Sequence, residues 1–289
     1  MKNQHLLNTC LLTCYTCLFI SSSCATKKHI SDSDDYHLVW SDEFNIDGIP
    51  NKDHWNYELG FIRNKEEQWY QKDNAICKNG YLTIQAKEER RKNPNFKSFS
   101  DENWRNNRDS IKITSSCLIT KNKHSWKFGR FEMRAKIPTE KGLWPAFWTL
   151  GLNGDWPSNG EIDIMEYYKN KILANIAWES NKKWKPVWDS ESIELNTFEN
   201  PKWSEQFHIW RMDWDENSIK LYLDNQLMNK VDLKTTYNST NNKNPFHHPH
   251  YILINLAVGG INGGDIEQKS LPAEFVIDYV RVYQKKYDK

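Results

Sequence analysis

The sequence has almost no net charge, since 39 Lys and Arg balance 38 Asp and Glu among 289 residues, for a formal charge of +1. A chain without a strong field of one sign does not attract a polyanion, so we expect no nucleic-acid partner. Residues 36–289 also lack a CxxC motif, a His/Cys spacing typical of zinc, an internal repeat and a long amphipathic helix. These absences argue against zinc-dependent, helical-repeat and nucleic-acid-binding proteins.

The chain also lacks an N-terminal apolar run long enough to cross a membrane. The run over residues 6–20 has about 15 residues, whereas a spanning helix needs about 20. Lys2 precedes it and three serines follow it, so we interpret residues 1–23 as an export signal peptide. Cys24 follows these small residues as in a bacterial lipoprotein box, which predicts lipidation there. Ser21 departs from the Leu usual in such boxes, and ordinary signal cleavage is the alternative.

This N-terminus predicts an exported protein, anchored by lipid at the bacterial cell envelope or surface, or otherwise secreted or periplasmic. The lipid is the only membrane contact we expect. Residues 24–35 are predicted to be a polar tether, because they have no core-forming pattern. Residues 36–289 are predicted to form a single domain, since all-β folds often reach that length as one unit. We expect a monomer.

Cysteine is scarce outside the N-terminal segment. Four of the six cysteines lie within the first 24 residues, which leaves Cys77 and Cys117 for the folded domain. Both lie in predicted strands. A disulfide between them and two buried free thiols are both compatible with the sequence.

Strand signals dominate the domain. Apolar and polar residues alternate over residues 81–86, 129–137, 219–223 and 275–283, and residues 251–258 are almost continuously apolar. Many short strands between turn signals predict an all-β jelly-roll sandwich. The 14 Trp and 13 Tyr suit a carbohydrate cleft, where aromatic rings stack on sugars, or an aromatic core. The charged segment 87–108 is predicted to be a surface loop, either a cleft wall or a solvated insertion.

The segment 160–167, GEIDIMEY, gathers three acids. In a regular strand Glu161 and Asp163 share one face, and a bulge at Ile164–Met165 would turn Glu166 toward them. Crowding of carboxyl groups raises the pKa of at least one of them, which therefore keeps its proton to a higher pH. Glycoside hydrolysis requires this combination, a protonated general acid beside an ionised nucleophile. An exposed acidic strand and a calcium site are the alternatives.

This segment resembles the active-site signature of glycoside hydrolase family 16. Further resemblances, in chain order, are the segments 40–44, 79–82, 128–132, 142–148, 207–210, 255–260 and 276–284. The resemblance implies a β-jelly roll of two curved antiparallel sheets with a concave substrate cleft. It implies that Glu161 is the nucleophile, Asp163 the assisting acid and Glu166 the general acid/base.

The resemblance also implies substrate-binding positions. Trp144 and Trp148 match aromatic positions on the non-reducing side of the cleft, and His208 and Asn255 match polar positions near it. A core role is the alternative for one of the tryptophans and for His208. Where many laminarinases carry a His in the strand after the signature, this sequence has an aromatic neighbourhood, so Trp178 is expected on the leaving-group side.

By resemblance, catalysis needs no cofactor. A structural calcium ion would be bound by backbone and side-chain oxygens of Glu43, Gly80 and Asp278. The expected activity is retaining hydrolysis of internal β-linkages in a polysaccharide, first a β-1,3- or mixed-linkage β-1,3/1,4-glucan. The alternatives are an endo-β-1,4-galactosidase acting on mucin O-glycans or keratan-type chains, and a non-catalytic glycan-binding protein on the same fold.

Overall fold

The computed structural model describes residues 36–182 and 184–286, and the account below concerns these residues. The predicted signal peptide, tether and lipidation site lie outside them. In the described part of the chain, no helix is long and apolar enough to span a membrane.

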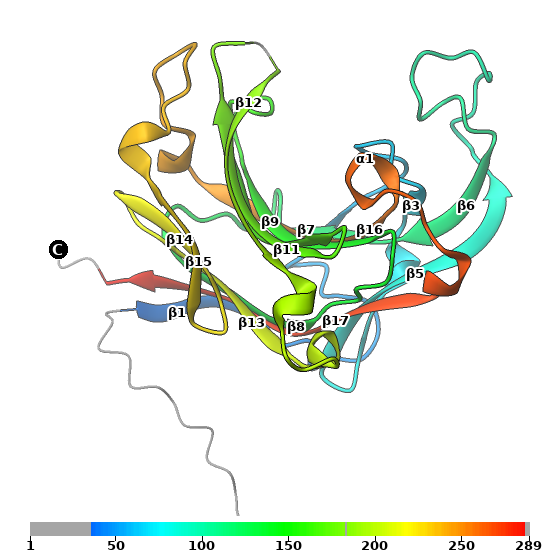
Figure 1. The fold of residues 1–289 in the computed structure, drawn as a ribbon, viewed down its shortest axis with the longest axis horizontal. Helices are drawn as coiled ribbons and strands as arrows, with labels where there is room; N and C mark the ends of the chain where they lie inside the picture. The colour runs from blue at the N-terminus through cyan, green and yellow to red at the C-terminus, as the bar shows by residue number, and fades with distance from the viewer. Residues whose placement is uncertain (1–35, 183, 287–289) are drawn as a thin grey trace, which may run out of the picture. The chain divides into compact units, whose positions relative to one another are not determined.

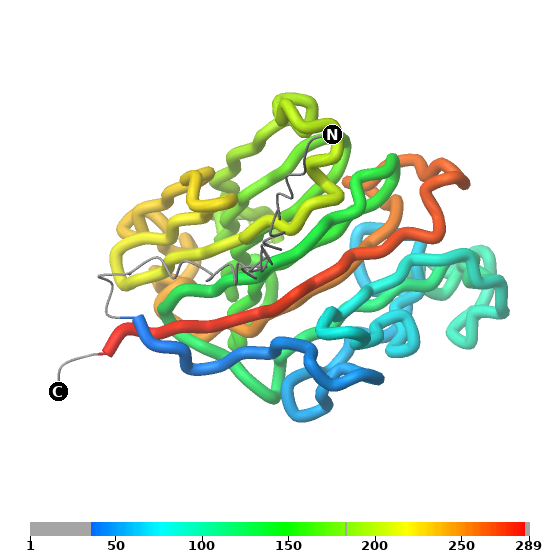
Figure 2. The backbone as a smooth tube through the Cα atoms, turned by 90° about the horizontal axis from the view of Figure 1, so that it is seen from below, coloured from blue at the N-terminus to red at the C-terminus, as the bar shows by residue number. Residues whose placement is uncertain are grey.

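Two sheets form the domain (Figure 1). The first runs in the order β15 (Gln226–Asp232), β14 (Ser218–Leu223), β13 (His208–Trp214), β8 (Gly129–Lys136), β17 (Ala273–Lys285), β5 (Tyr81–Lys92), β6 (Ser110–Ser115) and β3 (Gln68–Tyr70). Two more strands join it, β1 (Tyr36–Asp42) beside β17 and β4 (Ala75–Lys78) beside β5. Figure 2 shows the long β17 strand crossing this sheet next to β1.

The second sheet runs in the order β12 (Pro186–Glu194), β11 (Lys171–Glu179), β10 (Glu161–Tyr168), β9 (Leu143–Gly151), β16 (His250–Val258), β7 (Cys117–Ile119) and β2 (Asn56–Glu58). The one α-helix of the described residues is α1 (Gly260–Gly263). Short 3-10 turns cover Lys72–Asn74, Leu195–Thr197, Trp203–Glu205, Leu233–Thr235, Pro245–His247 and Gln268–Ser270. The predicted all-β sandwich of two largely antiparallel sheets is confirmed.

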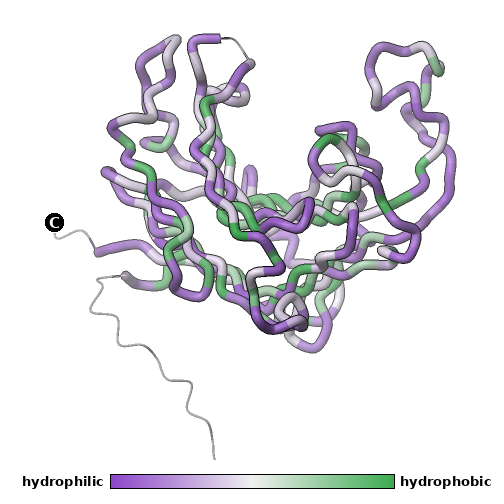
Figure 3. Tube along the Cα trace, viewed as in Figure 1, coloured by the Kyte–Doolittle hydropathy of each residue, from purple (hydrophilic) through white to green (hydrophobic). Residues whose placement is uncertain are grey.

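The main hydrophobic core lies between the two sheets. Phe147 and Ile162 of the second sheet face Trp210 and Phe275 of the first, and each of these side chains is fully buried. Figure 3 shows the apolar positions concentrated in the strands and the polar ones in the connecting loops. A second, smaller cluster forms on the other face of the second sheet, where Trp148, Tyr70, Tyr251 and Leu253 pack together.

The predicted bulge in strand β10 is confirmed. Asp163 lies opposite Asn175 of β11, but the next paired residue is Glu166, opposite Leu173. On the β9 side the register also shifts after Asp163. The added residue reverses the strand's parity, and this places Glu166 on the same face as the other two acids.

The connection between β5 and β6 begins later than predicted. Strand β5 continues to Lys92, so the irregular part covers residues 93–109. Asn93 closes this segment, because its side chain donates to the carbonyls of Arg105 at 3.1 Å and Arg108 at 2.7 Å. The segment rises on one side of the second sheet, and the β11–β12 hairpin rises on the other (Figure 1).

The two cysteines of the domain do not pair. Cys77 lies in β4 and Cys117 in β7, which belong to different sheets, and both are free and buried. Burial raises the pKa of both thiols, to about 12 for Cys77 and well above the ordinary value for Cys117. Neither is therefore a reactive thiolate at neutral pH.

We expect Phe147→Ala to lower the free energy of unfolding by about 3–5 kcal/mol, because the substitution opens a cavity between the sheets. Urea denaturation measures the change. The matched control is Leu227→Ala, whose side chain is 48% exposed and should shift stability by about 0.5 kcal/mol or less. Equal shifts in both variants would contradict this assignment of the core.

Candidate active site

The three acids line an open cleft of about 810 Å³ on the free face of the second sheet. Strand β10 supplies Glu161, Asp163 and Glu166, and the two flanking strands supply their neighbours. Asp163 is 2% exposed and Glu166 is 8% exposed, whereas Glu161 is more open to the cleft. The residues that the sequence places together are therefore together in space.

Each glutamate is held by hydrogen bonds from the surrounding elements. Glu166 accepts from Trp144 Nε1 of β9 at 2.8 Å and from Asn175 Nδ2 of β11 at 2.9 Å. Glu161 Oε2 accepts from Trp156 Nε1 at 2.6 Å. Both oxygens of Glu166 are thus engaged, and its orientation is fixed from two sides.

Asp163 has a different environment. Its Oδ2 is buried without a hydrogen-bond partner among the described residues. Its titratable neighbours are Glu161 and Glu166, and carboxyl groups can hydrogen-bond only if one of them carries a proton. Burial, followed by the negative charges of Glu166 and Glu161, raises the pKa of Asp163 well above its ordinary value. The raised pKa favours the protonated form, in which the Asp163 hydroxyl can donate to a neighbouring carboxylate.

The pKa values of both glutamates are raised as well. For Glu161 the pKa rises from 4.5 to about 7, mainly through burial and then through the charge on Glu166, while the Trp156 hydrogen bond opposes the shift. Burial also raises the pKa of Glu166, against the donors Trp144 and Asn175. The three groups interact and therefore titrate as one unit, which retains at least one proton near neutral pH.

Three of the predicted substrate-binding residues line the cleft, namely Trp144, Trp148 and Asn255. Asn255 Oδ1 accepts from Trp148 Nε1 at 2.7 Å, so these two side chains hold one another in place. Both tryptophans are largely buried, at 6% and 7% exposure. Their roles toward a substrate stay predictions.

Trp178 does not line the cleft. It packs in the core between the sheets, because strand parity decides where it points. Asn175 and Ala177 of β11 lie opposite Asp163 and Glu161, so the adjacent Trp178 faces the opposite side. The expectation from its neighbourhood in the sequence was therefore wrong for this residue.

His208 is the satisfied core histidine of the alternative interpretation. It lies on β13 of the other sheet and is 6% exposed. Its ring nitrogens lie 2.6 Å from Asp224 Oδ2 and 2.8 Å from the carbonyl of Trp203. It does not belong to the residues that line the cleft.

Sequence reasoning missed Arg63, Asn175, Trp156 and Trp188, all of which line the cleft. Trp188 of β12 lies opposite Ala177, which lies opposite Glu161, and it is 45% exposed. The pairing of 171–179 with 186–194 would have revealed its face, but the turn between them carries no strong hairpin signal. The loop residues Arg63 and Trp156 lack a periodic signal altogether.

The residues expected to bind calcium are engaged in other contacts. Glu43 accepts two hydrogen bonds from Arg281, at 2.8 and 2.7 Å, and the Asp278 carboxylate pairs with Arg134 at 2.5 Å. Both oxygens of Glu43 and one oxygen of Asp278 thus already contact an arginine. No group of three or more metal-ligating side chains occurs among the described residues. Calcium binding through backbone and side-chain oxygens of Glu43, Gly80 and Asp278 stays a prediction.

Comparison with known proteins agrees with this site. The model of glycosyl hydrolases family 16 matches residues 63–281. A beta-glucanase of Rhodothermus marinus is 31% identical over 86% of this chain and 85% of its own length. Glucan endo-1,3-beta-glucosidase A1 of Niallia circulans is 32% identical over 92% of this chain, which spans 42% of that relative.

Solved structures include one described with endo-acting O-glycanases that members of the human gut microbiota express to initiate mucin breakdown. It has a TM-score of 0.79 and 34% identity, over 87% of this chain and 92% of its own. The chain belongs to glycosyl hydrolases family 16. It is an endo-acting glycoside hydrolase with the jelly-roll fold of that family, as the sequence predicts.

We expect Glu161→Gln to make the protein more stable than the parent at pH 8 but not at pH 5. The folded pKa of Glu161, about 7, exceeds its ordinary value of 4.5, so the folded state binds more protons than the unfolded state in this window. Parent stability therefore falls as the pH rises from 4.5 to 7, and the variant escapes this loss. The expected difference, on the order of 2 kcal/mol, is measured by urea denaturation at both pH values.

The control for this measurement is Glu199→Gln, which removes an exposed carboxylate. It should change stability equally at pH 5 and pH 8. A pH-independent effect of Glu161→Gln would show that this carboxyl is not destabilised in the folded cleft.

Proposed function

We propose that this hydrolase cleaves internal β-glycosidic bonds with retention, with Glu161 as nucleophile and Glu166 as general acid/base. The observation that carries the proposal is the row of three interacting carboxyls on one face of β10. Glu161 is the member most open to the cleft, as an attacking group must be, and Glu166 is fixed by Trp144 and Asn175.

The electrostatic coupling suits this division of roles. The charge on Glu166 is one of the causes that raise the pKa of Glu161. When Glu166 carries a proton, that cause disappears, and Glu161 ionises more readily. A protonated acid and an ionised nucleophile therefore favour each other.

In the first step a Glu161 oxygen bonds to the anomeric carbon as the bond to the leaving oxygen breaks, and Glu166 gives its proton to that oxygen. In the second step water gives a proton to Glu166 and attacks the anomeric carbon, and the bond to Glu161 breaks. Both glutamates return to their starting states, and the configuration at the anomeric carbon is retained.

We propose a β-1,3- or mixed-linkage β-1,3/1,4-glucan as the first substrate, supported by the glucanases among the relatives. The second candidate is endo-β-1,4-galactosidase activity on mucin O-glycans or keratan-type chains, favoured by the likeness to an O-glycanase structure. A glycan-binding protein without turnover would not require three acids and their dedicated donors.

A polysaccharide panel tests the activity and the substrate together. It contains laminarin, barley mixed-linkage glucan, agarose, carrageenan, keratan sulfate and mucin O-glycans, with products read by chromatography. We expect oligosaccharides from the glucans, and a fall in turnover of at least about 10³-fold in Glu161→Gln, because the covalent step requires the carboxylate. The Glu199→Gln variant serves as the control.

Release from keratan or mucin alone would replace the glucan proposal with the galactosidase one and leave the catalytic residues unchanged. Hydrolysis by Glu161→Gln at the parental rate would overturn the assignment of the nucleophile. Binding without turnover on every polysaccharide would favour the glycan-binding alternative.

We also propose that the protein is exported and lipid-anchored at the bacterial cell envelope. The proposal rests on the apolar run over residues 6–20 and on Cys24 after small residues. Metabolic labelling with a palmitate analogue should label the parent and not Cys24→Ser, because the thiol is the acceptor. Equal label in both proteins would overturn anchoring at Cys24 and leave ordinary secretion.

A further inference from the structure

A row of paired residues crosses the second sheet from the catalytic acid to the far edge strand. Glu166 of β10 lies opposite Ala146 of β9, which lies opposite Asn255 of β16. Asn255 lies opposite Cys117 of β7, which lies opposite Glu58 of β2. Four strand spacings of about 4.8 Å separate the ends of this row, and its members share the cleft face.

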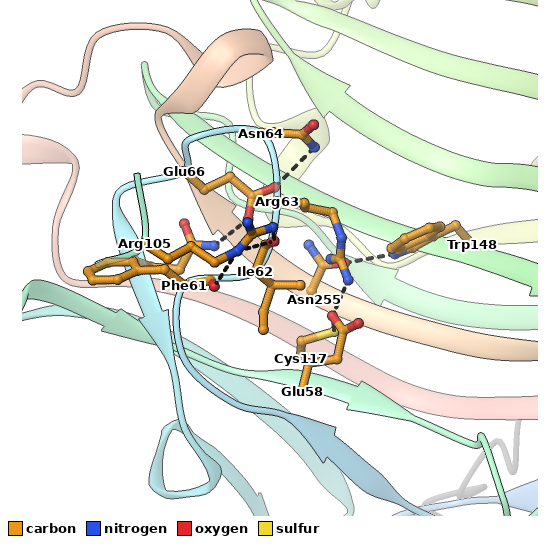
Figure 4. Close-up of polar contacts among 11 residues, drawn as sticks. Glu58, Phe61, Ile62, Arg63, Asn64, Glu66, Arg105, Cys117, Trp148 and Asn255 are labelled. Carbon is orange, nitrogen blue, oxygen red and sulfur yellow. Dashed lines mark hydrogen bonds and ion pairs between the residues drawn. The ribbon is translucent and has the colours of Figure 1, made fainter. Parts of the chain in front are cut away.

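Arg63 lies above the β2 end of this row (Figure 4). Its guanidinium group forms an ion pair with Glu58 and lies 5.0 Å from the ring centroid of Trp148. Trp148 itself packs into the small cluster with Tyr70 and Leu253 and is 7% exposed. This tryptophan therefore does not offer a sugar an open ring face, and Arg63 forms the surface at that point.

The loop that carries Arg63 is held in one conformation from outside. Arg105 Nε donates to the carbonyls of Phe61 at 3.0 Å and Ile62 at 2.9 Å. Arg108 donates to the carbonyls of Glu66 at 2.7 Å and Lys65 at 3.0 Å. The connection between β5 and β6 thus clamps residues 61–66 (Figure 4). A donor fixed in this way loses little conformational entropy on binding.

This end of the cleft is rich in donors. Within the described part of the chain, Glu58 is the one hydrogen-bond acceptor of Arg63, so most of its five N–H groups are left for a ligand. The Asn255 Oδ1 atom accepts a hydrogen bond from Trp148, and its Nδ2 group has no acceptor among the described residues. Both side chains line the cleft.

The local charge is close to balanced despite the guanidinium group. Glu58 neutralises Arg63 directly. Glu66, 3% exposed, lies in the same loop and accepts from Gln68 and Asn64. A sulfate or carboxylate group would meet these acids as well as the arginine. The chemistry therefore suits a neutral sugar whose adjacent hydroxyl oxygens accept hydrogen bonds.

We propose that Arg63 and Asn255 form a donor subsite for a neutral sugar residue, and that Arg63 is a specificity-determining residue of this hydrolase. The inference rests on the proposed function for its choice of substrates. It differs from an aromatic stacking platform, which the sequence predicts at Trp148.

The test measures binding rather than turnover, in a Glu161→Gln background, by calorimetry. The probes are laminari-oligosaccharides of two to six units and neutral poly-N-acetyllactosamine oligosaccharides of the same lengths. The test variant adds Glu58→Gln and Arg63→Gln together, so that no carboxylate is left unpaired. Arg63→Lys keeps the positive charge for the ion pair but loses the planar set of guanidinium donors. Arg90→Gln, on the exposed part of β5, is the matched control.

We expect the double substitution to weaken binding about 10- to 100-fold for oligosaccharides long enough to reach Arg63, the size typical of hydrogen bonds from a charged donor. Shorter ones should bind as before. Arg63→Lys should fall between, and Arg90→Gln should change nothing. Thermal unfolding and circular dichroism confirm that each variant is folded.

Equal losses at every length would show a structural role and overturn the proposal, as would no loss at any length or no binding of either series. Stronger binding of sulfated than of desulfated keratan oligosaccharides through Arg63 would overturn the neutral-sugar assignment. The proposed function is tested separately and is overturned if the parent hydrolyses none of the polysaccharides. Length-dependent binding through Arg63 would still support the donor subsite in that case.

Discussion

Three carboxyl groups crowded on one face of a single strand impose the conditions that the rest of the cleft satisfies. Removing charged groups from water is costly, so buried carboxylates need donors or protons. Trp144, Asn175 and Trp156 supply the donors, from β9, from β11 and from the loop before β10. Asp163 has no donor at its Oδ2 among the described residues, and its raised pKa favours the protonated form. The site is therefore a network whose members come from neighbouring elements and are fixed by the sheet.

The sheet also provides the space in which the acids act. Each glutamate has an alanine beside it on one neighbouring strand. Ala146 of β9 lies beside Glu166, and Ala177 of β11 lies beside Glu161. Larger groups return one strand further out, with Asn255 beyond Ala146 and Trp188 beyond Ala177. The alternation of small and large residues across the strands leaves room for a sugar ring above the acids.

Features that depend on the alternation of side chains within one strand could be predicted from the sequence. Features that depend on which residues of two strands pair could not. The bulge and the shared face of the acids follow from counting residues within one strand, and the structure confirms the bulge. Trp178 was misplaced because its face depends on which residue of β11 pairs with Glu161. His208 resembles a cleft position but lies in the other sheet. Arg63 is placed by contacts from a segment more than 40 residues away, at Arg105, and no local pattern encodes that distance.

The two ends of the cleft present different side-chain chemistry. On the β12 side Trp188 offers an exposed ring, which stacks on any sugar with an apolar face. On the β2 side Arg63 and Asn255 offer fixed donors. A site built to hydrogen-bond a hydroxyl rejects an analogue without it far more strongly than an apolar surface can discriminate, because its buried donors are then left unpaired. If Arg63 and Asn255 form the proposed subsite, the β2 side is where hydroxyl configuration is read, and it distinguishes a glucan from a galactose-containing chain.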